Sequence, residues 1–232
     1  MEALEAGREI DKVILQKGLA GNAIRELKTT LQAHKIPVQE VPPEKFNKLT
    51  RTNHQGVLAY ISLIGYASLD HIISSSYQAG RSPRLIILDR INDVRNFGAI
   101  ARTAEGMGFD SIIIPSKGSA QINEEAMKTS SGALNHIPIC REQNLQHTIK
   151  YLKESGIVVI GCTEKAHESI YSLNLAGPIA LLFGSEEDGI SPLLLKSADH
   201  LVRIPMKGRI ASFNVSVSVA IMAGEVLRQS GI

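Results

Sequence analysis

Apolar and polar residues alternate over short distances in the first sixty residues of the chain. The pattern predicts strands at 12–15, 37–41 and 57–63, with helices at 22–33 and 44–50. Two consecutive prolines at 42 and 43 end the second of these strands, because proline has no amide hydrogen to donate to a neighbouring strand. This part of the chain therefore predicts a small α/β unit.

The pattern changes near residue 84 to continuous apolar runs, each followed by a polar loop. Such runs are typical of parallel strands that are buried on both faces. The predicted strands are 85–88, 111–114, 157–160, 179–183 and 201–204, and the predicted helices between them are 98–106, 147–154 and 214–228. The stretch 64–82 is rich in Ser and Gly and predicts a linker. The expected domains are therefore 1–63 and 83–232, joined by that linker.

Ligands of open parallel sheets bind beyond the carboxyl ends of the strands, where loop amides and helix N-termini point at them. Four loops of this chain are therefore the candidates for binding or catalysis. These loops are 89–98, 161–168, 184–191 and 205–214.

Composition excludes several classes of protein. No apolar run approaches the roughly 18 residues of a membrane span, and Glu2 and Glu5 stand where a signal peptide would need a basic start, which predicts a cytoplasmic protein. Two cysteines, Cys140 and Cys162, are too few for a disulfide framework. The net charge of +2 is small, so any RNA must be held at local contacts.

The first loop offers Asn96 and, one helical turn after Gly98, Arg102. Asn96 is either the N-cap of the following helix or a functional residue. An arginine in the first turn of a helix opposes the helix dipole, so Arg102 is expected to have an anionic partner such as a phosphate.

The second loop carries three acidic residues, Glu186 to Asp188, between Gly184 and Gly189. They would repel a phosphate, and neither a Walker A motif nor a dinucleotide-binding glycine motif is present. An exposed helix start is the alternative interpretation of the acids. No histidine stands at ligand spacing, which predicts that no metal is bound.

The third loop ends with Ser212 and Asn214, either of which could cap the last predicted helix. The histidines show no Ser-His-Asp or Cys-His pattern, which disfavours a hydrolase with a side-chain nucleophile.

Together, three segments resemble the motifs of the SpoU/TrmH family of RNA ribose 2'-O-methyltransferases, which belong to the SPOUT class. The segments are 96–104, 182–189 and 204–216, and the resemblance covers about residues 83 to 232. Residues 1–63, through the segment His54-Gln55-Gly56-Val57, are similar to the ribosomal-protein-like substrate-binding domain of the subgroup that methylates a guanosine of 23S rRNA.

The resemblance implies a fold, a cofactor and a set of site residues. The implied fold is a SPOUT α/β domain with a deep trefoil knot around a parallel sheet, preceded by the small α/β domain. It also implies a homodimer through the C-terminal domain, in which the motif arginine of one protomer meets the cofactor of its partner. The residues implied to bind S-adenosylmethionine are Thr163, Gly184, Ile204, Met206 and Phe213. Those implied to serve RNA and catalysis are Asn96, Arg102, Glu186, Ser212 and Asn214.

The chain departs from the family pattern at Val94, which replaces a proline, and at Phe213, which replaces a leucine; neither change removes a reacting group. The predicted reaction is methyl transfer to a ribose 2'-hydroxyl, with rRNA favoured over tRNA as substrate. A tRNA ribose methyltransferase and a non-catalytic rRNA-binding assembly factor are the alternatives. Because a guanidinium keeps its proton, we expect Arg102 to anchor a phosphate and stabilise developing alkoxide charge rather than remove a proton.

Overall fold

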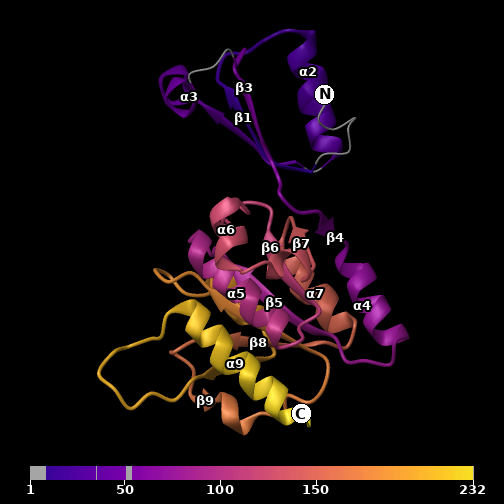
Figure 1. Ribbon diagram of the computed structural model, residues 1–232, viewed down its shortest axis with the longest axis vertical. Coiled ribbons are helices and arrows are strands. Elements are labelled where there is room, and N and C mark those ends of the chain that lie inside the picture. Colours follow the sequence, from indigo (N-terminus) through magenta and orange to yellow (C-terminus); the bar gives the residue numbers. More distant parts are fainter. Residues whose placement is uncertain (1–8, 35, 51–53, 232) are drawn as a thin grey trace. The chain divides into compact units, whose positions relative to one another are not determined.

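The computed structural model describes residues 9–34, 36–50 and 54–231, and the chain divides into two compact units, Met1–Gly65 and Tyr66–Ile232 (Figure 1). The first unit contains a three-stranded sheet in the order β2-β1-β3. Strand β1 (Ile10–Gln16) is parallel to β2 (Val38–Val41) and antiparallel to β3 (Val57–Ile61). The predicted strands in this part of the chain are confirmed.

Two helices cover opposite faces of this small sheet. Alternating residues of β1 point to opposite faces, and Val13 packs with Leu31 of α2 (Asn22–Ala33) while Ile14 packs with Phe46 of α3 (Pro43–Leu49). The two small cores explain why the first sixty residues alternate rather than form continuous apolar runs.

The second unit is built on an eight-stranded sheet in which every pairing between named strands is parallel, in the order β4-β7-β6-β5-β10-β8-β11-β9. Its strands are β4 (Tyr66–Ala67), β5 (Arg84–Asp89), β6 (Ser111–Pro115), β7 (Ile139–Glu142), β8 (Val158–Cys162), β9 (Glu168–Ser169), β10 (Ile179–Gly184) and β11 (His200–Arg203). All five predicted strands of this unit are confirmed, and β10 lies between β5 and β8. Because the strands are parallel, their carboxyl ends share one edge of the sheet.

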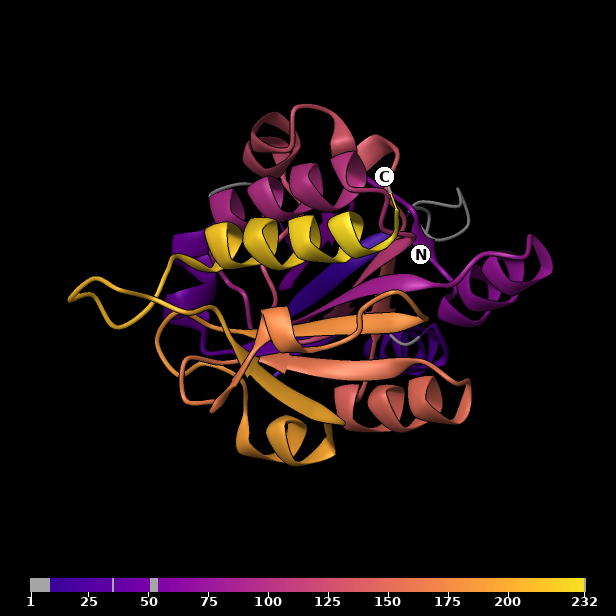
Figure 2. The same ribbon diagram turned by 90° about the horizontal axis from the view of Figure 1, so that it is seen from below.

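Helices pack on both faces of the large sheet (Figure 2). On one face, α5 (Val94–Gly106) lies beside α9 (Val215–Gln229) and α6 (Glu124–Thr129). On the other face lie α7 (Leu145–Glu154) and α8 (Pro192–Ser197), which pack against each other. Two short 3-10 helices, η1 (Ala133–Asn135) and η2 (Ile170–Ser172), complete the unit.

The structure differs from the predicted linker at 64–82. Strand β4 pairs with β7 at one edge of the sheet, and α4 (Leu69–Gln78) follows it directly. Leu69 and Ile73 of α4 are buried in the same core as α7. The serines that suggested a linker have structural positions, since Ser68 caps α4 and Ser76 is buried against Asp110.

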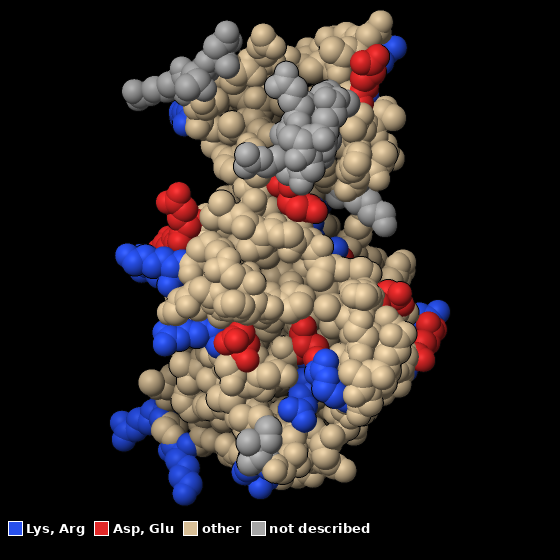
Figure 3. All heavy atoms as spheres, turned by 45° about the vertical axis from the view of Figure 1, so that its right-hand side comes forward, with Lys and Arg blue, Asp and Glu red and all other residues tan. Residues whose placement is uncertain are grey.

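The surface of the protein mixes charges of both signs. On the face in Figure 3, Lys and Arg side chains occur in separate small groups among Asp and Glu side chains. Within the described part of the chain, no helix is long and apolar enough to cross a membrane.

Candidate functional site

A cavity of about 310 Å³ lies beyond the carboxyl ends of β8, β10 and β11. Its walls come from three segments that follow these strands, 162–165, 183–190 and 202–218. Three of the four loops expected to carry chemistry therefore meet at one place. The volume falls in the range of sites that bind small molecules and cofactors.

Gly184 shapes the wall that follows β10. A Cβ atom built on this residue would lie 2.0 Å from the backbone of both Gly189 and Ile190, so only glycine fits. The chain folds back at once, with a bridge between Ser185 and Gly189 and a hydrogen bond from the Asp188 amide to Ser185 Oγ at 3.2 Å. Residues 186–188 therefore form a turn, and the interpretation of the three acids as a helix start is wrong.

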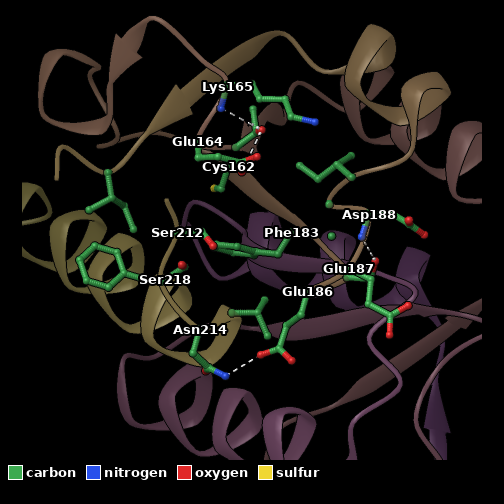
Figure 4. Close-up of a pocket in the computed structure, with 18 of the residues that line it drawn as sticks. Cys162, Glu164, Lys165, Phe183, Glu186, Glu187, Asp188, Ser212, Asn214 and Ser218 are labelled. Carbon is green, nitrogen blue, oxygen red and sulfur yellow. Dashed lines mark hydrogen bonds between the residues drawn. The ribbon is translucent and has the colours of Figure 1, made fainter. Parts of the chain in front are cut away.

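Glu186 on this turn is held by two asparagines from distant parts of the chain. The Asn214 amide group donates to Glu186 Oε1 at 2.6 Å and to Asn96 Oδ1 at 3.1 Å, and the Asn96 amide group donates to Glu186 Oε1 at 2.9 Å. Figure 4 shows the Glu186 carboxylate pointing toward Asn214. These hydrogen bonds form the Asn96–Glu186–Asn214 network, which joins α5, the turn 186–188 and the start of α9.

Asn214 is also the N-cap of α9. Its Oδ1 accepts hydrogen bonds from the Ser216 amide at 2.9 Å and from Ser216 Oγ at 2.6 Å. The capping interpretation is confirmed, and it uses the side-chain oxygen, whereas the contacts to Glu186 and Asn96 use the side-chain nitrogen. Ser212 is not the cap, and it lines the cavity.

Helix α5 begins four residues earlier than predicted, at Val94. Its N-cap is Asp93, whose carboxylate accepts from the amides of Arg95 and Asn96, so the capping interpretation of Asn96 is wrong. Arg102 is consequently the ninth residue of the helix, and the argument from the helix dipole does not apply to it. Arg102 is exposed, does not line the cavity and forms no ion pair with any described residue.

The structure brings most of the predicted site residues together. Those that line the cavity are Thr163, Gly184, Glu186, Ile204, Met206, Ser212, Phe213 and Asn214. Asn96 does not line the cavity but donates a hydrogen bond to Glu186, which does. Arg102 does not line the cavity. The side chain of Phe213 remains 40% exposed, so the open side of the cavity is partly apolar.

Several lining residues were not predicted. They are Cys162, Glu164, Lys165, Phe183, Ser185, Glu187, Asp188, Gly189, Ile190, Val202, Val215 and Ser218. Helical spacing could have indicated Ser218, which lies four residues after Asn214 and so on the same face of α9. Burial raises the pKa of the Cys162 thiol well above its ordinary value, so this residue is protonated at neutral pH and is a poor nucleophile.

The lining carries four carboxylates and one ammonium group, from Glu164, Glu186, Glu187, Asp188 and Lys165. This excess of negative charge favours a ligand that bears positive charge and disfavours a phosphate. Among the described residues, no three His, Cys, Asp or Glu side chains are grouped so that they could hold a metal ion. The arrangement suits a cationic organic ligand with one apolar portion.

Comparison with known proteins identifies both units. Residues 83–224 match the model of the SpoU rRNA Methylase family, and residues 1–67 match the model for RNA 2'-O ribose methyltransferase substrate binding. A protein of Staphylococcus saprophyticus assigned to the TrmH family of tRNA/rRNA methyltransferases is 36% identical over 229 residues, covering 98% of this chain and 92% of the relative. A Bacillus subtilis protein with the same assignment is 31% identical, covering 99% and 92%.

Solved structures share the fold. The SpoU methyltransferase AviRb from Streptomyces viridochromogenes superposes with a TM-score of 0.65 at 23% identity, covering 98% of this chain and 85% of that one. AviRb has also been solved in complex with the cofactor AdoMet, with a TM-score of 0.64. On the family models and the relatives, the chain belongs to the SpoU/TrmH family of RNA 2'-O-ribose methyltransferases.

Proposed function

We propose that the protein transfers the methyl group of S-adenosylmethionine to the ribose 2'-hydroxyl of a guanosine in 23S rRNA. The observation that carries this proposal is the cavity, because its walls join the second and third motif loops and its Glu186 is held by the first. Family membership gives the reaction class, and the choice of rRNA and of guanosine is the proposed part.

The lining of the cavity suits S-adenosylmethionine. Apolar side chains from Phe183, Ile204 and Met206 suit an adenine ring, and the carboxylates suit the sulfonium and amino groups. When bound, this cofactor supplies an electrophilic methyl group. We assign cofactor binding to the residues implied by the motifs, Thr163, Gly184, Ile204, Met206 and Phe213.

The chain's own contribution to the reaction is to hold the acceptor ribose in line with that methyl group. Asn96, Glu186, Ser212 and Asn214 are assigned to this task, since they meet at the cavity. Negative charge that develops on the 2'-oxygen needs a nearby cation. Arg102 is assigned that role, and it is also assigned to anchor the adjacent phosphate of the RNA.

Arg102 does not line the cavity of its own chain, so we also propose a homodimer in which the arginine of one protomer meets the cofactor of its partner. Support comes from its exposed position on α5, a helix that packs beside α9. Apolar side chains are exposed near the start of α9, among them Ile210 at 76% and Val217 at 44%. In the proposed dimer this surface is buried between the two subunits, and the guanidinium of one meets the cavity of the other.

The C-terminal chain is proposed to be knotted as in other SPOUT proteins. The strand order supports this, because β11 lies beyond β8, and the chain then returns to α9, which contacts β10 in the middle of the sheet. The loop between β11 and α9 projects from the sheet in Figure 2.

The substrate is tested with labelled S-adenosylmethionine and two unmodified transcripts, a 23S rRNA fragment and a tRNA. We expect label in alkali-resistant dinucleotides of the rRNA alone. Label in the tRNA would support the methyl-transfer reaction and overturn the choice of rRNA. The names of the relatives include both RNA classes. Cofactor binding without label in either transcript would point to a need for assembled ribosomal particles or to an RNA-binding assembly factor.

The role of Arg102 is tested by Arg102→Ala. Because the alkoxide charge that Arg102 is assigned to stabilise develops only in the transition state, we expect transfer to fall by at least about a hundredfold while the Kd for S-adenosylmethionine changes by less than about threefold. Calorimetry gives the Kd and a filter assay gives the rate. A large loss of cofactor affinity, or full activity in the variant, would contradict this role.

A further inference from the structure

We infer that Arg90 is a positioning residue that holds the turn 185–189 in place and so sets one wall of the cofactor cavity. Arg90 does not line the cavity and belongs to none of the motif segments described above. The inference rests on the proposed function, because it assigns the wall a role in cofactor binding.

The guanidinium of Arg90 spans from the end of β5 to the turn. Its Nη1 lies 3.0 Å from Asp188 Oδ2, its Nη2 donates to the Gly189 carbonyl at 3.1 Å, and its Nε donates to Asp89 Oδ1 at 3.3 Å. A single exposed ion pair stabilises little. A planar guanidinium with three partners in fixed directions defines a position, which a flexible ammonium cannot do.

Asp89 provides the anchor for this arrangement. It is 5% exposed, and its second oxygen, Oδ2, accepts a hydrogen bond from the Ser191 amide at 2.7 Å. One carboxylate thus holds the guanidinium and also the chain just beyond the turn. The turn is therefore fixed from both sides, by Arg90 and Asp89 on one and by the close approach to Gly184 on the other.

The backbone of Arg90 indicates that this position is specified by its surroundings. Its φ is +60°, in the left-handed region that non-glycine residues seldom adopt. Such conformations persist where neighbouring contacts over-determine them, and they are frequent at functional sites. The unfavourable φ places the side chain where it can reach Asp188 and Gly189.

The turn that Arg90 holds carries Glu186, and Glu186 is the shared acceptor of the Asn96–Glu186–Asn214 network. Movement of the turn would therefore displace both the cavity wall and the contact to α5 and α9. Loss of the guanidinium should weaken cofactor binding without removing any group that touches the cofactor.

The experiment compares full-length Arg90→Ala, Arg90→Gly and Arg90→Lys with wild type. Glycine removes the guanidinium but accepts φ +60° without strain, so it separates the side chain from the backbone. The matched control is Arg81→Ala, which removes an arginine paired with Asp110 at 2.8 Å near the amino end of β5. The measurements are the Kd for S-adenosylmethionine, KM and kcat for transfer, and hydrogen exchange of peptides covering 184–191.

We expect the alanine and glycine variants to raise both Kd and KM for the cofactor by about tenfold, and to exchange faster in 184–191. Lysine should restore part of the affinity, since it keeps one ion pair. Arg81→Ala should match wild type. Unchanged Kd in the alanine and glycine variants would overturn the inference, as would a glycine variant that behaves as wild type while the alanine variant is impaired. If wild type methylates no RNA, the proposed function fails, and the Kd and exchange data still decide the role of Arg90.

Discussion

Asn214 shows how one residue connects the stability of a helix with the geometry of a site. Its oxygen caps α9, and its nitrogen donates to Glu186 and Asn96. A substitution to alanine removes both sets of contacts, so it cannot separate them. Serine is the informative replacement, because it is about as good an N-cap as asparagine and has no amide group to donate across the cavity.

We predict that Asn214→Ser keeps the free energy of unfolding within about 0.5 kcal/mol of wild type and lowers methyl transfer by at least about tenfold. Asn214→Ala should lose the same activity and, in addition, about 1 kcal/mol of stability. Urea unfolding and single-turnover transfer measure the two effects. Full activity in the serine variant would show that the contact to Glu186 is dispensable.

The sequence predicted the residues of the site better than their local structure. Motif resemblance named Glu186, Asn214 and six other residues that line the cavity, and it missed twelve further lining residues. The predicted start of α5 was wrong because Gly98 was taken as a helix boundary, whereas Asp93 caps the helix. The position of Arg90 could not be predicted, since its two partners in the turn are 98 and 99 residues away in the sequence.

Gly98 lies inside α5 because two helices meet there. A Cβ atom at this position would lie 2.8 Å from Thr129 Cβ and 2.9 Å from the Ala126 carbonyl oxygen. A glycine within a helix costs about 1 kcal/mol relative to alanine. At Gly98 that cost is offset by the close packing of α5 against α6.

We predict that Gly98→Ala destabilises the protein by about 1–3 kcal/mol, because the added methyl group forces α5 and α6 apart. The control is Gly106→Ala in the same helix, where nothing lies within 4 Å of the added atom. That change should stabilise the protein by up to about 1 kcal/mol. Equal effects of the two substitutions in urea unfolding would contradict this account of the helix contact.

Elements with a strong pattern were predicted, and short ones were not. The apolar runs of β5, β6 and β10 are buried on both faces, as the pattern indicated, and β8 is buried beyond Val158. Strand β11 lies nearer the edge of the sheet and buries only Val202. Strand β7 has only two apolar residues before Arg141, and α6 buries only Ala126, so neither shows a periodic signal. Tertiary packing rather than local sequence decides these elements.

At the scale of the whole molecule, the sequence indicated two units but not where the second begins. Strand order depends on pairings between distant segments, and β4 pairs with β7 more than seventy residues away. A segment rich in serine therefore looked like a linker although its helix buries Leu69 and Ile73. The two boundaries make different predictions about truncated chains.

We predict that residues 66–232 fold alone, bind S-adenosylmethionine with a Kd within about threefold of the full chain and methylate RNA poorly, because they lack the substrate-binding unit. Residues 83–232 should be less stable by about 3–6 kcal/mol, since removal of α4 exposes the core around Leu69 and Ile73, and loss of β4 leaves the edge of β7 unpaired. Thermal unfolding, size-exclusion chromatography and calorimetry on the two fragments give the comparison. Equal stability of the two fragments would show that 66–82 is the linker that its composition suggested. Aggregation of the shorter fragment alone would show that the second unit needs β4 and α4 to fold.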